Sequence, residues 1–326
     1  MKIFFVGDTK SQFIKMDANM LEATGNEVTI IPHPVGTKRY PSFLLDLLCN
    51  KIKNYDLVWV WSADIHAIPI ILLAHHYNKP VVVFCGDYEF GNYPEISYGN
   101  QRSFIRGYPT RWVLKNADEI ITSSPITSVI ATKVGLGVKL IDGSFVLPSE
   151  EEYYETHTMA HISTLPWYVD TTEFSGPTIK KENMVSTACA SKNACARKGM
   201  GTFIEAAHGH CDTYILGNVE RSEYIHILKQ SQVYCQLTYP GAESFGVSLL
   251  EAMYCGCVPV TTNDPCLIWV AGNTGLVVPY GDVLATREAI EKAMTMDGEP
   301  ARRRAMEFTR EKRMASLNEI LWWYRK

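Results

Sequence analysis

The chain has 326 residues, of which 46% are hydrophobic and 20% are charged, and its formal net charge is −4. Disordered chains combine low hydrophobicity with high net charge, so this composition excludes that class. The slightly acidic balance offers no basic field for a nucleic-acid backbone, and nucleic acid is not an expected partner. At roughly 100–200 residues per domain, the length favours two compact domains.

The cysteines and the apolar segments indicate the cytoplasm. Nine Cys residues, without a regular framework spacing, are typical of a reducing compartment. The apolar run at residues 3–6 is too short for a signal peptide and predicts a buried strand. The apolar stretch at residues 68–74 falls short of the roughly 18–20 residues that span a bilayer. We expect a cytoplasmic protein, peripheral at the inner membrane face if it contacts a membrane.

In the first half of the chain, short apolar runs alternate with amphipathic segments. The runs predict buried strands at residues 2–6, 27–31, 57–61, 81–85 and 119–122. Helices are expected at residues 13–24, 42–53 and 124–134, whereas residues 88–111 look loop-rich. This alternation favours parallel βαβ units, whose ligand crevice lies at the carboxyl ends of the strands.

The middle of the chain interrupts this pattern. Residues 150–155 form an acidic stretch, and residues 175–177 look like a linker. Strands are then expected at residues 183–190, 213–216, 234–237 and 258–261, with helices at 201–208 and 223–230. The sequence therefore predicts two α/β domains of similar size.

The stretch from Pro240 to Met253 carries the most chemistry. It follows a predicted strand, and a helix is expected to begin at about Phe245. A helix start after a turn of small residues presents free backbone N–H groups and a positive dipole end, which suit a phosphate. Glu243 in the turn and Glu251 further along can accept hydrogen bonds from neutral hydroxyls. A sugar joined to a nucleoside diphosphate offers both a phosphate and neutral hydroxyls. The plainer alternative is that Glu243 caps the helix and Glu251 is a solvated side chain.

Several segments resemble the retaining GT-B glycosyltransferases of the Glu-x7-Glu family, which includes sucrose synthases and bacterial mannosyl- and glucosyltransferases. Residues 243–253 match the family frame Glu-x-Phe-Gly-x-x-x-x-Glu-Ala-Met position for position. Residues 255–260 resemble its Gly-x-Pro-Val strand, and residues 274–282 its Thr-Gly-Leu-Leu-Val-x-x-Gly-Asp segment. Further matches lie at residues 117–124, 165–174 and 197–207.

The resemblance implies an α/β GT-B fold, with two Rossmann-like domains facing each other across a cleft. We expect an acceptor-binding domain at residues 1–174, a nucleotide-sugar-binding domain at 175–308, and a final helix at 309–326 that crosses back to the first domain. The implied activity is that of a retaining hexosyltransferase that needs no metal and no cofactor. It moves a hexose from a UDP- or GDP-linked sugar to a glycan, lipid or other acceptor, with attack on the face that the diphosphate leaves.

The resemblance also implies roles for individual residues. Glu243 holds hydroxyls of the donor sugar, Glu251 holds the ribose diol, and Lys198 with Arg197 faces the diphosphate. A basic pair directly before a helix is disfavoured by the helix dipole, and a bound anion would relieve that conflict. Neither glutamate is expected to be a covalent nucleophile. The remaining expected donor contacts are Gly7, Lys192, Phe245, Gly246, Val247 and Ser248.

The sequence departs from the family pattern around the acceptor and the diphosphate. Asn193 replaces the arginine of a Gly-Arg pair, so Arg197 or Lys192 must supply the missing cation. The family's acceptor-side His is absent after the strand at residues 81–85, and Asp87 or His66 is expected in its place. The expected acceptor contacts are Tyr88, Tyr93, Arg102 and Arg106.

Residues 301–326 carry eight basic and three acidic side chains in an otherwise acidic protein. By helical spacing, Leu317, Ile320, Leu321 and Tyr324 share a face, beside Trp322 and Trp323. Packing on the first domain explains this face, and peripheral contact of this helix with an anionic membrane is the alternative.

Two other functions stay open. The missing His and the altered Gly-Arg pair motivate a donor-binding GT-B subunit that has lost catalysis. A different GT-B reaction, sugar-nucleotide epimerisation or phosphorolysis, is the second. A zinc site at His208, His210 and Cys211 lacks a second ligand pair and is interpreted as a turn.

Overall fold

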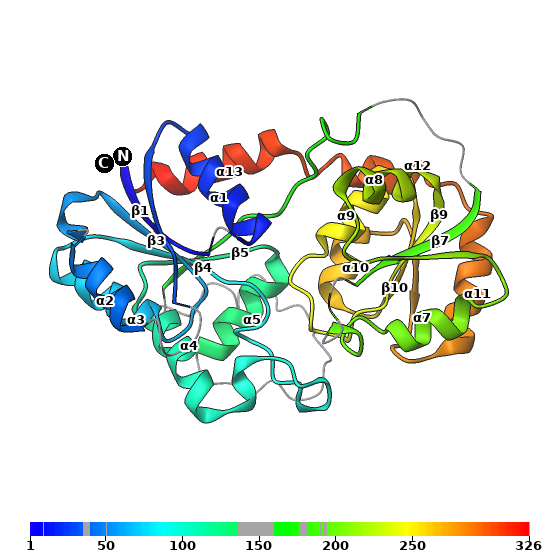
Figure 1. Ribbon diagram of the computed structural model, residues 1–326, viewed down its shortest axis with the longest axis horizontal. Coiled ribbons are helices and arrows are strands. Elements are labelled where there is room, and N and C mark those ends of the chain that lie inside the picture. The colour runs from blue at the N-terminus through cyan, green and yellow to red at the C-terminus, as the bar shows by residue number, and fades with distance from the viewer. Residues whose placement is uncertain are drawn as a thin grey trace. The chain divides into compact units, whose positions relative to one another are not determined.

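The computed structural model describes residues 1–8, 10–34, 40–49, 51–135, 160–175, 182–189, 191 and 194–325. The chain divides into two compact units (Figure 1). The first comprises Met1–Leu165 and Met314–Lys326, and the second comprises Pro166–Arg313. The divisions thus fall after Leu165 and Arg313, whereas the sequence analysis places domain boundaries at residues 174 and 308.

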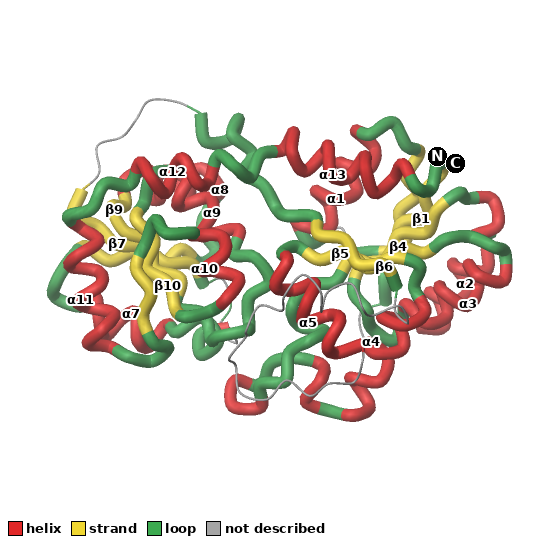
Figure 2. The backbone as a smooth tube through the Cα atoms, turned by 180° about the vertical axis from the view of Figure 1, so that it is seen from behind, coloured by secondary structure: helices red, strands yellow, loops and turns green. Residues whose placement is uncertain are grey.

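The first unit is built on a sheet of six parallel strands in the order β2-β1-β3-β4-β5-β6 (Figure 2). Apolar runs form these strands because both faces of a parallel sheet are covered by helices. Ile3 to Val6 and Leu57 to Val60 are accordingly fully buried. The strands are β1 (Lys2–Val6), β2 (Glu27–Ile31), β3 (Leu57–Trp61), β4 (Val81–Phe84), β5 (Glu119–Thr122) and β6 (His161–Thr164).

Helices cover both faces of this sheet. In both views α1 (Gln12–Ala23) lies with α13 (Arg310–Trp322) on one face (Figures 1 and 2). The opposite face carries α2 (Tyr40–Cys49), α3 (Ala67–His76), α4 (Phe104–Asn116) and α5 (Pro125–Gly135), with the short 3-10 helices η2 (Ile52–Asn54), η3 (Pro94–Ile96) and η4 (Asn100–Arg102) among the connections.

Helix α4 occupies residues 104–111 of the stretch that is predicted to be loop-rich, residues 88–111. Gly107 and Pro109 lie inside this helix, and both residues ordinarily indicate a turn. A Cβ at Gly107 would lie 2.6 Å from Oε1 of Gln101, so a larger residue there would displace the end of that side chain. Pro109 is buried, although its ring removes one helical hydrogen bond.

The second unit contains five parallel strands in the order β11-β10-β9-β7-β8. They are β7 (Glu182–Ala188), β8 (Asp212–Leu216), β9 (Ser231–Gln236), β10 (Val258–Thr262) and β11 (Leu276–Val278). Helices α7 (Met200–Ala207) and α11 (Val283–Met294) pack on one face, and α8 (Arg221–Gln230), α9 (Val247–Tyr254) and α12 (Glu299–Ala305) lie on the other (Figure 1). Helix α10 (Pro265–Ala271) packs against α9 and α12.

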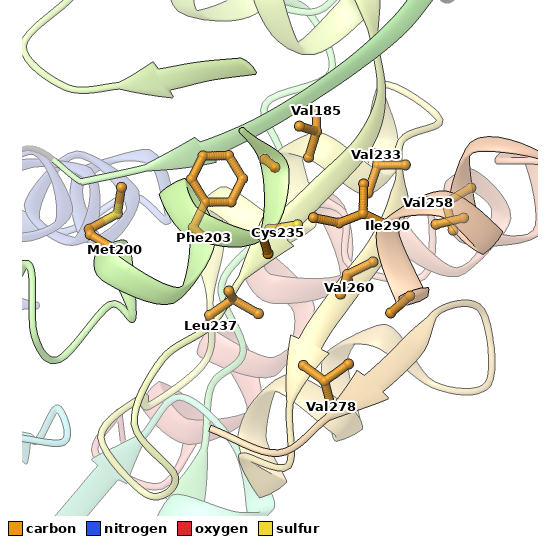
Figure 3. Packing of buried hydrophobic residues seen from close by; sticks show 14 residues of the cluster. Val185, Met200, Phe203, Val233, Cys235, Leu237, Val258, Val260, Val278 and Ile290 are labelled. Atoms are coloured by element: carbon orange, nitrogen blue, oxygen red, sulfur yellow. The ribbon is translucent and has the colours of Figure 1, made fainter. Parts of the chain in front are cut away.

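One buried cluster joins this sheet to α7 and α11 (Figure 3). Phe203 of α7 and Ile290 of α11 pack against Val185, Cys235 and Val260 on three neighbouring strands. All five side chains are at most 2% exposed. The cluster fixes the strands at whose carboxyl ends the candidate site lies.

The predicted apolar face of the last helix is buried in the first unit from Met314 onward. Leu317 and Leu321 are almost fully buried, whereas Trp322 and Trp323 are 50% and 69% exposed. The hydroxyl of Tyr324 donates to Oε2 of Glu119 on β5 at 2.7 Å. In the described part of the chain, no helix is long and apolar enough to cross a bilayer.

Candidate functional site

Two predicted site residues, Lys198 and Glu243, lie close together beyond the carboxyl ends of β7 and β9. These strands are paired neighbours in the second unit, although Lys198 and Glu243 are 45 positions apart. Lys198 follows β7 at the start of α7, and Glu243 lies in the turn between β9 and α9. Loops that follow neighbouring parallel strands emerge at the same edge of the sheet, which is where α/β proteins bind ligands.

Lys198 and Glu243 form a well-shielded ion pair. Nζ of Lys198 lies 2.5 Å from Oε2 of Glu243, and the two side chains are 16% and 13% exposed. Gln236 and Thr238 also donate to Oε2, at 2.8 and 3.3 Å. Burial alone would raise the pKa of Glu243, but Lys198, Arg197 and the hydrogen bonds lower it below its usual value. Glu243 is therefore an anion that accepts hydrogen bonds.

Arg197 stands beside this pair. Its Nη1 donates to the carbonyl oxygen of Ala242 at 2.9 Å, which ties the loop after β7 to the turn that carries Glu243. The backbone N–H of Tyr239 in turn donates to the carbonyl oxygen of Arg197 at 2.7 Å. Two cationic side chains thus lie at one end of the site, and the structure fixes both by contacts with the β9–α9 turn.

The turn is held from its other side by Asp264, the N-cap of α10. One carboxyl oxygen of Asp264 accepts from Gly241 N–H at 2.7 Å, and the other accepts from Cys266 and Leu267 N–H. Gln236 connects the two halves of the site, because its Nε2 contacts Glu243 while its Oε1 accepts from Ser248 Oγ at 3.0 Å.

Helix α9 begins where the sequence places the phosphate site. Gly246 is its N-cap with φ +95, a conformation that side-chain-bearing residues rarely adopt, and a Cβ there would lie 2.7 Å from Leu267. Phe245 is fully buried and packs against Trp269 and Phe308. The first N–H groups of the helix, from Val247 and Ser248, follow directly and suit an anion.

Glu251 has an ion-pair partner, Arg221, that is not predicted from the sequence. Nη2 of Arg221 lies 2.6 Å from Oε1 of Glu251 and 2.7 Å from Oε2 of Glu173. Glu251 is only 12% exposed, so it is not the solvated side chain of the plainer alternative. Arg221 is the first residue of α8, and only tertiary structure brings it to α9.

Apart from Lys192, the remaining predicted site residues belong to the first unit, in segments that follow its strands. Gly7 follows β1, where a Cβ would lie 2.7 Å from Ile14. Asp87 follows β4, and its Oδ2 accepts from the hydroxyl of Tyr98 at 2.5 Å. His66 is 3% exposed and its Nε2 contacts the carbonyl oxygen of Trp61 at 2.9 Å. His66 is thus almost fully buried, and its expected role in place of the acceptor-side His stays a prediction.

The predicted acceptor residues differ in their surroundings. Tyr88 is 39% exposed and stacks edge-on against Tyr98, whereas Tyr93 is only 9% exposed. Nε of Arg102 donates to the carbonyl oxygen of Gly99 at 3.0 Å, and Arg106 is exposed on the first turn of α4. Lys192, Asn193 and most of the predicted acidic stretch and linker (residues 150–155, 176 and 177) lie outside the described residues.

Two further titratable groups of the first unit were not singled out from the sequence. Glu89 is 4% exposed, and Oε1 of its carboxyl has no partner within the described residues. Burial raises the pKa of Glu89 to about 7. His33, whose ring centroid lies 5.3 Å from that of His66, has a lowered pKa because of burial. Both residues follow predicted strands, but the sequence gives no sign of their burial.

The described residues contain no group of three or more His, Cys, Asp or Glu side chains that could hold a metal ion. His210 instead pairs with Glu291 at 3.4 Å, in the turn predicted for residues 208–211. Independence of metal stays a prediction.

Comparisons with known proteins agree with this geometry. Residues 197–312 match the family described as glycosyl transferases group 1. Sucrose-phosphate synthase from Thermosynechococcus elongatus is 14% identical, with a TM-score of 0.75 over 99% of this chain and 98% of that one. HepE of Anabaena in complex with UDP-glucose is 13% identical, with a TM-score of 0.69 over 98% and 99%. The catalytic domain of starch synthase IV from Arabidopsis thaliana, bound to ADP and acarbose, is 12% identical, with a TM-score of 0.66 over 99% of each chain. No curated protein sequence matches the chain.

The two parallel sheets and these likenesses show that the chain has the GT-B fold. Its second unit carries a glycosyl transferases group 1 domain that includes Arg197, Lys198, Glu243 and Glu251. By domain family and fold, the protein is a glycosyltransferase.

Proposed function

We propose that this glycosyltransferase is a retaining hexosyltransferase that uses a UDP- or GDP-linked sugar and needs no metal ion. The observation that carries the proposal is the Lys198–Glu243 pair close to the N-terminus of α9. It combines a buried anion suited to sugar hydroxyls with cationic and N–H groups suited to a diphosphate.

Breaking the bond between the anomeric carbon and the phosphate creates positive charge on the sugar and negative charge on the leaving group. Lys198, Arg197 and the N–H groups from Phe245 to Ser248 stabilise the departing diphosphate. Glu243 orients the sugar through its hydroxyls, and Glu251 holds the ribose diol. The acceptor hydroxyl attacks the face that the diphosphate leaves, and its proton passes to the departing phosphate oxygen, so that configuration is retained.

We place the acceptor, a glycan, a lipid or another hydroxyl compound, on the first unit. The tyrosines and arginines around η4 and α4 support this assignment because they suit sugar rings and phosphate groups equally. We also propose a cytoplasmic location, with peripheral contact to the inner membrane face through the exposed Trp322 and Trp323 at the end of α13.

The first experiment is a thermal-shift screen of the purified chain against UDP, GDP, ADP and their common sugar conjugates. A ligand that binds the folded state raises the unfolding temperature by mass action. One nucleotide should stabilise the wild type, and Lys198→Ala and Glu251→Ala should abolish the effect. Arg287→Ala is the matched control, because it removes a second-unit cation that donates to the backbone carbonyl oxygens of Ala206 and Glu205 in α7.

The second experiment follows donor hydrolysis by proton NMR with the nucleotide sugar found in the screen. Release of the sugar with its original anomeric configuration, at an equal rate with and without EDTA, supports a retaining, metal-independent reaction. Inverted sugar would contradict retention. Binding without turnover in the presence of any acceptor would favour the catalytically impaired subunit, and conversion of the donor to another sugar nucleotide would favour an epimerase.

A further inference from the structure

Arg221 occupies a defined position beside the carboxylate assigned to the ribose. Its side chain is 45% exposed, and its guanidinium carbon lies 5.3 Å from the ring centroid of Phe174 and 5.1 Å from that of Tyr224. Glu173 receives two hydrogen bonds from it, from Nε at 2.9 Å and from Nη2 at 2.7 Å. Two aromatic rings and two hydrogen bonds to Oε2 of Glu173 therefore orient the group from several directions.

The hydrogen-bond donors of Arg221 are only partly used. A guanidinium has five N–H groups. Nε uses one and Nη2 uses two, the second of them for Oε1 of Glu251 at 2.6 Å. Among the described residues, Nη1 contacts no protein acceptor, so two N–H groups of a fixed cation remain for a ligand or water.

The order of the residues along α9 indicates where the free N–H groups of Arg221 would lie relative to a bound nucleotide. The diphosphate end of a nucleotide is assigned to Lys198 and the start of α9, and Glu251 lies about one turn beyond Ser248 on the same helix. The ribose links diphosphate and base, so the base lies beyond Glu251 as seen from the helix start. Helix α8, which packs beside α9, begins there with Arg221.

We propose that Arg221 reads the base of the donor nucleotide, with Nη1 donating to the carbonyl oxygen of uracil or guanine. The inference rests on the proposed function, because it takes Glu251 as the ribose-binding carboxylate. Guanine and uracil present an oxygen where adenine and cytosine present an amino group. A guanidinium has no acceptor for that amino group, so Arg221 selects the carbonyl base of each pair.

The test compares bases of equal ring size, so the size of the pocket does not affect the comparison. Dissociation constants are measured by calorimetry for UDP against CDP and for GDP against ADP. In the wild type, the preferred carbonyl nucleotide should bind at least about tenfold more tightly than its amino counterpart, a difference of about 1.4 kcal/mol. In Arg221→Ala this preference should fall to within about twofold, whereas Arg287→Ala should keep it.

Ribose 5-phosphate, which has no base, separates base reading from support of Glu251. Its affinity should be nearly equal in the wild type and in Arg221→Ala. Weaker binding of ribose 5-phosphate by the variant would show that Arg221 only positions Glu251. Tighter binding of every ligand would show that Arg221 occupies the ribose position in the free protein. Either result overturns the proposal.

Two remaining outcomes separate this inference from the proposed function. If one nucleotide binds and Lys198→Ala abolishes binding, but the base preference is absent or survives in Arg221→Ala, only the reading of the base by Arg221 is wrong. If no nucleotide binds the wild type, the donor site and this inference fail together.

Discussion

At the scale of single residues, the Lys198–Glu243 pair makes a prediction about stability. Lys198→Met leaves a shielded carboxylate without its cation, and the free energy of unfolding should fall by about 3 kcal/mol. Adding Glu243→Gln should restore most of that loss, because the double variant carries no unpaired charge. Urea unfolding at pH 7 measures the loss in Lys198→Met and its recovery in the double variant. An equal stability of wild type and Lys198→Met would contradict the pairing.

The same pair has a defined dependence on pH. Because the pKa of Glu243 is lowered in the folded state, its stabilising contribution is complete above about pH 4.5 and is lost only as the pH falls through the lowered value. The double variant Lys198→Met with Glu243→Gln serves as the reference, since it has neither charge.

The buried ring of His66 makes a second prediction about stability in acid. Burial and the neighbouring His33 lower the pKa of His66 to about 4, so the folded state holds the neutral ring. The unfolded chain binds the proton first, and stability falls as the pH drops from about 6.5 to about 4, by roughly 3 kcal/mol for this group. His66→Gln should flatten that part of the stability curve in chemical unfolding. An unchanged slope would contradict the neutral, buried ring.

How much of the site the sequence predicts depends on the range of the contacts. Glu243, Phe245 and Glu251 share one local frame, and their mutual placement follows from the turn and the helix. Arg221 and Gln236 are not predicted as site residues, because only the pairing of β7, β8 and β9 brings the end of β9 and the segment after β8 to Glu243 and Glu251. Glu173 precedes β7 and is linked to Glu251 through Arg221. His66 shows the converse, because its place after a strand gives no sign that only 3% of the residue is exposed.

At the scale of secondary structure, Gly246 makes a prediction about α9. Gly246→Ala forces a side chain into a positive φ and brings its Cβ to 2.7 Å from Leu267. Gly281→Ala is a matched control, because Gly281 also has positive φ, +82, but nothing within 4 Å of the added Cβ. The control should lose about 1 kcal/mol and Gly246→Ala more than twice that, with weakened nucleotide binding. Equal losses would contradict the steric argument.

Most strands follow directly from the apolar runs, and their ends differ by up to three residues from expectation. The exceptions have physical reasons. Strand β6 (His161–Thr164) is short and polar, and it joins the sheet by pairing with β5 rather than through an apolar run of its own. Helix α4 contains two residues that sequence patterns treat as helix breakers. In both cases neighbouring elements, absent from any local window, decide the structure.

At the scale of the whole molecule, the first unit is assembled from two distant parts of the chain. Tyr324→Phe removes the hydroxyl that donates to the buried carboxyl of Glu119, and the first unit should lose about 1–3 kcal/mol of stability. Hydrogen exchange should report faster opening of β4 and β5, with the amides of the second unit unchanged. Trp323→Ala is the control, because that side chain is 69% exposed. Loss of protection in the second unit instead would contradict the division.

This arrangement sets the order in which the protein can be completed during translation. The ribosome produces every strand of the first unit before the second unit, but α13 only after it. Residues 166–313 therefore have all their own strands available while the apolar surface that Leu317 and Leu321 later cover is still open to solvent. In the nascent chain, the second unit is finished first, and the first unit waits for the last helix.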